Sequence, residues 1–308
     1  MPNEQVASLV DQLSNHLVVQ QLRLQPFPLA EARESFDGFA EWLPCPADVK
    51  VESVSAGGVA AEWIVAPGAG EARAVLFLHG GCFVIGSVNS HRELCARISA
   101  ATGCAVLLVD YRRAPEHPFP AALEDALTAY QWLMDRGIAS ARIVLAGDSA
   151  GGNLTVSTMV ALRDRNQPLP AAGVCFSPWF DLECTGKHPE CPDLILRRED
   201  LRYLGRFYLG KTDGRSPLAS PLYADVRGLP PIYIQVGTAE VLLDDSHRFV
   251  ERARKVGVDV KLDSWDGLFH VFQLYPMLPE ATDALERMAR FVTSNARCNR
   301  LWPPHLGR

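Results

Sequence analysis

Short apolar or β-branched runs alternate with longer amphipathic segments from residue 49 onward. This alternation is typical of a mostly parallel sheet that carries helices on both faces. The sequence therefore predicts an α/β fold built on a large sheet. Eight strands are expected, at 49–54, 62–66, 74–78, 105–110, 143–146, 173–177, 232–236 and 258–263.

Helical spacing of apolar residues predicts helices between these strands. Ser90 is expected to cap the first of them, and Gly257 to end the one that begins at Asp244 or Asp245. The expected helices span 91–102, 121–136, 153–166, 244–256 and 280–296.

Two segments break the alternation. Residues 1–45 hold an amphipathic helix, expected at 6–19, and then a proline-rich connector. Residues 182–229 hold a helix, expected at 199–208, and a loop rich in proline, serine and glycine. Both segments are long enough to fold over one end of the sheet.

Composition and charge narrow the classes of function. The 308 residues are 48% hydrophobic and 21% charged, as in soluble globular proteins. The net charge is -6 and the sequence contains no run of basic residues, so a nucleic-acid partner is not expected. The apolar runs are too short to span a membrane. Residues 1–20 lack a basic start and a continuous apolar stretch, which favours a cytoplasmic protein.

The eight cysteines form no CxxC pair and no zinc-type spacing with histidine. They are expected to be free thiols. No metal and no cofactor is expected.

A sharp turn between the strand at 143–146 and the next helix carries the most specific motif. It reads Gly147-Asp148-Ser149-Ala150-Gly151-Gly152, which is a GxSxG sequence between a strand and a helix. Such a turn projects the serine Oγ from the edge of the sheet. No lysine follows at the spacing of a phosphate-binding loop. Ser149 is therefore the candidate nucleophile.

A serine nucleophile of acyl transfer needs N–H donors for the negative charge that develops on the carbonyl oxygen. His79-Gly80-Gly81 directly follows the strand at 74–78. We expect the N–H groups of Gly80, Gly81 and Ala150 to form this oxyanion hole. His79 is expected to fix the loop by hydrogen bonding rather than to act as a base.

Chain order selects the remaining members of a catalytic triad. In α/β-hydrolases the order is serine, acid, histidine, and the last two follow late strands. His270 follows the last predicted strand and is the candidate base. Glu240 lies in the loop after 232–236 and is the favoured acid, with Asp244 as the rival.

These motifs resemble the bacterial hormone-sensitive lipase family of α/β-hydrolase carboxylesterases. The resemblance implies an eight-stranded, mostly parallel sheet with one antiparallel strand. It also implies an N-terminal cap segment at 1–45, a catalytic domain at 46–308 and a cap insertion at about 182–229. The residues that carry it are His79-Gly80-Gly81, Asp110-Tyr111-Arg112, Ala114-Pro115-Glu116, Phe119-Pro120-Ala121-Ala122, the Gly147–Gly152 turn, and the stretches around Glu240 and His270.

Two positions depart from the family pattern. Cys82 stands where the family has a further glycine, and Glu240 stands where aspartate is more common. The resemblance implies a serine carboxylesterase of short to medium acyl-chain esters that acts on a small molecule in solution and often forms a homodimer. A lactone or acetyl-ester hydrolase of secondary metabolism is the alternative enzyme. A non-catalytic small-molecule receptor on the same scaffold is the alternative of another class.

Overall fold

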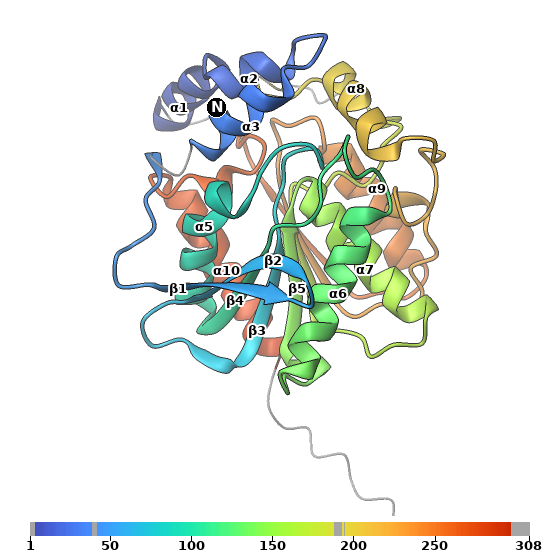
Figure 1. The fold of residues 1–308 in the computed structure, drawn as a ribbon. Coiled ribbons are helices and arrows are strands. Elements are labelled where there is room, and N and C mark those ends of the chain that lie inside the picture. Colours follow the sequence, from blue (N-terminus) through green and yellow to red (C-terminus); the bar gives the residue numbers. More distant parts are fainter. Residues whose placement is uncertain (1–3, 39–41, 188–192, 194, 297–308) are drawn as a thin grey trace, which may run out of the picture.

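A single eight-stranded sheet forms the centre of the computed structural model, which describes residues 4–38, 42–187, 193 and 195–296 (Figure 1). The strand order is β1-β2-β4-β3-β5-β6-β7-β8. β2 is antiparallel to both of its neighbours, and the other adjacent pairs from β4 to β8 are parallel. The predicted α/β fold with one antiparallel strand is confirmed. The strands are β1 (Lys50–Ala56), β2 (Val59–Val65), β3 (Gly70–Leu78), β4 (Cys104–Val109), β5 (Ile143–Asp148), β6 (Ala172–Phe176), β7 (Ile232–Gly237) and β8 (Val260–Trp265).

Helices cover both faces of this sheet (Figure 1). Alternate residues of β4 point to opposite faces: Ala105, Leu107 and Val109 join the core beneath α6, α7 and α9, whereas Val106 and Leu108 join the core beneath α5 and α10. The helices and short 3₁₀ turns of this layer are α5 (Val88–Thr102), α6 (Ala121–Asp135), η1 (Ser140–Arg142), α7 (Ala150–Asp164), η2 (Pro221–Tyr223), α9 (Leu243–Lys255), η3 (Phe272–Leu274) and α10 (Pro279–Asn295).

Four more helices lie together beyond one end of the sheet: α1 (Glu4–Ser14), α2 (Leu17–Leu22), α3 (Leu29–Asp37) and α8 (Arg198–Leu209) (Figure 1). They come from the two segments that interrupt the strand pattern. Side chains of α1, α2 and α3 line the same cavity as Ser149, which directly follows β5. The two irregular segments therefore cover the end of the sheet at which the parallel strands finish.

The prediction of a single helix at 6–19 is wrong, because the helix is interrupted between α1 and α2. The side chains of Ser14 and Asn15 both donate to the carbonyl of Asp11, which competes with continuation of the helix. His16 then caps α2, with its Nδ1 accepting from the N–H of Val18. The predicted proline-rich connector also contains a helix, α3.

Several element starts also differ from the sequence predictions: β2 begins three residues, and β3 four residues, before the expected strand. Ser87, not Ser90, is the N-cap of α5, and Ser90 is the reciprocal partner in a capping box. α7 begins at Ala150, three residues earlier than predicted. The N-cap of α9 is Leu242, because the neighbouring carboxylates of Asp244 and Asp245 bind other groups.

Candidate functional site

Ser149 occupies the turn between β5 and α7 in a conformation that few non-glycine residues adopt, with φ 52° and ψ -114°. Its N–H donates to the carbonyl of Phe176 on β6, which ties the turn to the sheet. A Cβ on Gly147 would overlap the carbonyl of Gly151, and a Cβ on Gly151 would overlap the carbonyl of Leu78. The two glycines are therefore required by close backbone approach.

The loop after β3 lies beside this turn because Leu78 is paired with Gly147 in the sheet. The N–H of Gly80 donates to Asp148 Oδ1 over 2.9 Å, so it is not free for a substrate oxygen. This corrects the expectation for Gly80. The structure gives no acceptor among the described residues for the N–H groups of Gly81, Cys82 and Ala150. Gly81 and Cys82 line the cavity that holds Ser149.

The side chain of Cys82 is buried, and burial raises the pKa of its thiol to about 12. A neutral thiol is a poor nucleophile. The cysteine that replaces the expected glycine therefore fills space beside the cavity.

His79 holds this loop through contacts with Gly80 and Tyr111. Its Nδ1 lies 2.7 Å from the carbonyl of Gly80, and its ring stacks on Tyr111 at a centroid distance of 4.1 Å. Burial, with a smaller contribution from His91, holds the pKa of His79 well below its ordinary value. The ring is therefore neutral, and Nδ1 must carry the proton that binds the carbonyl oxygen. The expectation that His79 holds the loop is confirmed.

Glu240 and His270 meet in the loops after β7 and β8. His270 Nδ1 lies 3.8 Å from Glu240 Oε1, within ion-pair range but longer than a hydrogen bond. Among the described residues, neither of these two buried atoms has a hydrogen-bond partner. The two atoms therefore face each other without a hydrogen bond, and a small approach would join them.

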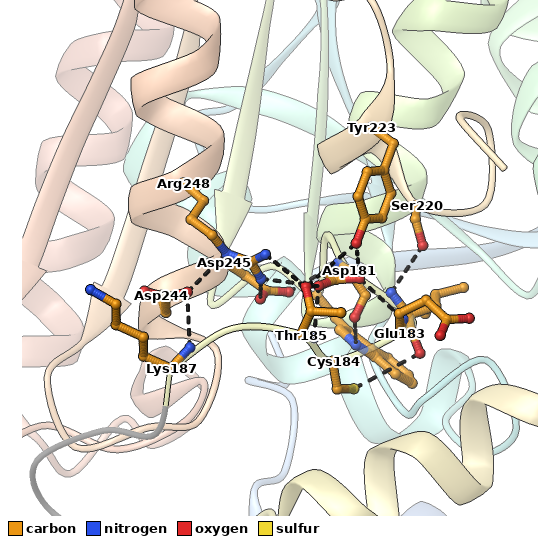
Figure 2. A network of polar contacts seen from close by, with 12 residues as sticks. Asp181, Glu183, Cys184, Thr185, Lys187, Ser220, Tyr223, Asp244, Asp245 and Arg248 are labelled. Carbon is orange, nitrogen blue, oxygen red and sulfur yellow. Dashed lines mark hydrogen bonds and ion pairs between the residues drawn. The ribbon is translucent and has the colours of Figure 1, made fainter. Parts of the chain in front are cut away.

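Asp244, the rival acid, points into a different network (Figure 2). It lies 2.8 Å from Arg248 Nε and accepts from the N–H of Lys187. Arg248 also binds Asp181 and Asp245. Burial, reinforced by the neighbouring Asp181, raises the pKa of Asp245 to about 7 even though Arg248 opposes the shift. This cluster joins the start of α9 to the segment after β6, and its carboxylates are engaged there.

Three carboxylates act on the protonation of His270. Burial is the largest single effect and lowers the pKa of this imidazole, but Glu240, Asp193 and Asp148 together outweigh it. The pKa of His270 therefore lies above its ordinary value of 6.5. An imidazolium formed at this position is stabilised by its surroundings.

Sequence reasoning did not find Ser177 and Asp193, which hold this pair in place. Ser177 Oγ donates to Glu240 Oε2 over 2.7 Å and accepts from the N–H of Val271. Asp193 accepts from the N–H of Val241 over 2.9 Å. The only signal for Ser177 was its position at the end of a predicted buried strand. Asp193 gave no signal, because it lies in the irregular segment before α8.

The cavity at Ser149 is mostly apolar. His270, Asp148 and Gly81 supply its polar surface beside Ser149. The N-terminal helices and the loops before α8 and around η3 supply its apolar wall: Leu13, Val18, Val19, Leu22, Phe36, Ile195, Leu196, Val271, Leu274 and Tyr275. Such a cavity suits an uncharged organic group next to a reactive oxygen.

Within the described part of the chain, no three histidine, cysteine or acidic side chains gather as metal ligands. No helix among those residues has the length and apolar character to cross a bilayer. The six cysteines placed there are free, and Cys191 and Cys298 lie outside the described residues.

Comparisons with known proteins agree with this geometry. Residues 75–274 match a family model described as an alpha/beta hydrolase fold. An acetyl-hydrolase of Streptomyces hygroscopicus is 47% identical over 251 residues, which cover 80% of this chain and 82% of that protein. An esterase of Acinetobacter venetianus is 36% identical, over 89% of this chain and 91% of that protein. The crystal structure of an esterase from the bacterial hormone-sensitive lipase family superposes with a TM-score of 0.90 at 41% identity, covering 96% of this chain and 100% of that one.

Proposed function

The chain belongs to the bacterial hormone-sensitive lipase family of α/β-hydrolases, and from that premise we propose that it is a serine carboxylesterase of short to medium acyl-chain esters. One observation supports this most: Ser149 in its strained turn shares an apolar cavity with His270, which is backed by the buried carboxylate of Glu240. A nucleophile, a base and an orienting acid are the parts that acyl transfer requires.

In the first half of the proposed reaction, Ser149 Oγ attacks the ester carbonyl while His270 takes the hydroxyl proton. Negative charge develops on the carbonyl oxygen, and the N–H groups of Gly81, Cys82 and Ala150 donate to it. The tetrahedral intermediate then collapses. The carbon–oxygen bond to the leaving alcohol breaks, His270 returns the proton to that alcohol, and the acyl group stays on Ser149.

The second half repeats these steps with water as the nucleophile. His270 takes a proton from water while the water oxygen attacks the acyl carbon. The bond between that carbon and Ser149 Oγ then breaks. His270 then returns the proton to Ser149, and the carboxylic acid leaves. Glu240 holds the imidazole in one tautomer and stabilises the imidazolium in both halves. No metal or cofactor enters these steps.

The substrate class follows from the cavity wall. Its lining of leucine, isoleucine, valine, phenylalanine and tyrosine side chains favours an uncharged acyl group. A narrower activity on acetyl esters is the second candidate, because the relative from Streptomyces hygroscopicus is named an acetyl-hydrolase. Lactones would use the same steps and differ only in the shape they require.

We further propose that residues 1–45 and about 182–229 act as the cap of a catalytic domain at 46–308. Residues from both segments contribute to the cavity wall, which supports this division. The cytoplasmic location and the homodimer stay predictions from the sequence and from the resemblance. Cell fractionation tests the first, and gel filtration with light scattering tests the second.

A panel of p-nitrophenyl esters from acetate to palmitate tests the proposed function. The wild-type protein and Ser149→Ala are assayed, each with and without a serine-directed phosphonate. Turnover that peaks at short or medium chains and disappears in Ser149→Ala supports the proposal. Turnover of acetate alone favours the acetyl-ester activity. Folded protein that hydrolyses no ester in the panel contradicts the esterase and favours the receptor.

A further inference from the structure

The hydroxyl of Ser177 lies where three loops of the site converge. Ser177 directly follows β6, Glu240 follows β7, and Val271 follows β8. Ser177 Oγ donates to Glu240 Oε2 over 2.7 Å and accepts from the N–H of Val271 over 3.1 Å. One fully buried side chain therefore binds both the acid and the residue next to His270.

The position of this hydroxyl is itself fixed by the backbone. The N–H of Ser177 donates to the carbonyl of Gln235 on β7 over 2.7 Å. Its φ of 45° is in the left-handed region, where few residues with a side chain are found. Such a conformation persists only where the surrounding structure determines it, and it often marks a functional site.

Two hydrogen bonds orient the Glu240 carboxylate. Oε2 accepts from Ser177 Oγ and, over 3.3 Å, from the N–H of Gly237. With Oε2 held, the other oxygen, Oε1, faces His270 Nδ1. The contact to Val271 fixes the backbone on the histidine side. Both ends of the Glu240–His270 contact thus depend on one hydroxyl.

We propose that Ser177 is a positioning residue for the reaction: its hydroxyl orients Glu240 toward His270 and fixes the His270 loop at the same time. The inference rests on the proposed esterase function, because it concerns how the triad acid is aimed. Ser177 is not among the residues that line the cavity at Ser149, so it acts through Glu240 and His270.

Loss of the hydroxyl has two consequences. Glu240 Oε2 keeps only the longer bond from Gly237, so the carboxylate can rotate away from His270. The buried N–H of Val271 loses the acceptor that the structure gives it. A displacement of about 1 Å in a catalytic group lowers rates by up to about 10²-fold. We therefore expect kcat to fall between about 10-fold and 10²-fold, with KM nearly unchanged.

The acid limb of the pH profile reports the same contact. His270 faces the carboxylates of Glu240, Asp193 and Asp148, which raise its pKa. The other titratable groups that line the cavity are Cys82 and Tyr275; burial raises the pKa of each, so both stay neutral across this limb. A carboxylate that turns away from His270 raises its pKa less. The acid limb of kcat/KM should therefore move to lower pH.

Ser177→Ala and Ser177→Gly are compared with Ser99→Ala on p-nitrophenyl butyrate. Ser177→Gly also removes the hydroxyl but accepts the positive φ without strain. Ser99 is the matched control: its buried Oγ likewise accepts from one N–H, that of Ala66, and donates to one oxygen, that of Cys104. It lies in α5 and touches no residue of the site.

We expect both Ser177 variants to lose turnover and to shift the acid limb. Ser99→Ala should keep turnover within about twofold of the wild type and leave the acid limb in place. The melting temperature of each variant separates loss of folding from loss of positioning. NMR titration of the His270 ring protons should give a lower pKa in the Ser177 variants alone, because a rotated Glu240 raises that pKa less, and this readout requires no turnover.

The inference is overturned if either folded Ser177 variant keeps the wild-type kcat, pH profile and His270 pKa, or if Ser99→Ala changes them equally. Ser149→Ala, assayed beside them, separates the two claims. If Ser149→Ala remains active, the proposed function fails. If it is inactive while the Ser177 variants match the wild type, only the inference fails.

Discussion

The turn at Ser149 and the pair formed by Glu240 and His270 are held in place by different parts of the chain. At the turn, backbone meets backbone: Gly147 and Gly151 approach the carbonyls of Gly151 and Leu78 so closely that no side chain fits. At the pair, side chains hold loops together: Ser177 bonds the side chain of Glu240, and Asp193 bonds the N–H of the next residue, Val241.

This difference explains why the two regions differ in geometry. The conformation of Ser149 is fixed by sterics, and its φ of 52° follows from the sheet and from α7. The contact between His270 Nδ1 and Glu240 Oε1 is 3.8 Å, longer than a hydrogen bond. Such bonds in enzymes are often long without substrate and tighten when it binds. The nucleophile is rigidly placed, whereas the pair depends on adjustable loops.

Gly151→Ala should give the largest effect, because its Cβ would overlap the backbone carbonyl of Leu78. No side-chain rotation relieves a backbone overlap. We expect the free energy of unfolding to fall by at least about 4 kcal/mol, with loss of activity. Gly70→Ala is the control, since nothing lies within 4 Å of a Cβ there. Denaturant titration checks both, and equal midpoints for the two variants would refute the steric account of the turn.

Glu240→Gln should give the next largest effect, through loss of the negative charge beside His270. Removal of the orienting carboxylate in a serine triad costs up to about 10⁴-fold in kcat. We expect a loss of at least about 10²-fold. Asp244→Asn weakens only the contacts to Arg248 and Lys187 and should stay within about threefold of the wild type. Steady-state kinetics on one ester measures both, and the reverse ranking would assign the acid to Asp244.

Asp193→Asn should give the smallest effect, seen in pH dependence. Wild-type kcat/KM should fall as pH falls through the pKa of His270, which lies above 6.5. The charge of Asp193 contributes to raising that pKa, so its removal should move the acid limb to lower pH.

Asn keeps the shape of this side chain and one acceptor oxygen for the nearby N–H groups. Asp259→Asn, at an exposed position just before β8, is the charge-matched control and should leave the profile unchanged. A pH profile of kcat/KM for the three proteins decides the matter. An Asp193→Asn limb that coincides with the wild type would remove this carboxylate from the account.

The parts that sequence could predict are those that local rules determine. Strand positions follow from apolar runs, and Ser149 follows from glycines that a tight turn requires. The engagement of Gly80 by Asp148 could not be predicted, because it joins residues 68 positions apart. The sequence favoured Glu240 over Asp244 only because Glu240 lies in the loop after the strand, whereas Asp244, four residues later, lies at the expected helix start. The break at His16 depends on local side-chain bonds that the amphipathic pattern does not register.

Trapping of the acyl-enzyme is the sharpest test of Ser149 as the nucleophile. A slowly deacylating p-nitrophenyl ester is mixed with the protein at low pH, the reaction is quenched, and the intact protein and its peptides are weighed by mass spectrometry. We expect one added acyl group, located on Ser149 and absent from Ser149→Ala. Ester turnover without any adduct, or an adduct that persists in Ser149→Ala, would contradict it.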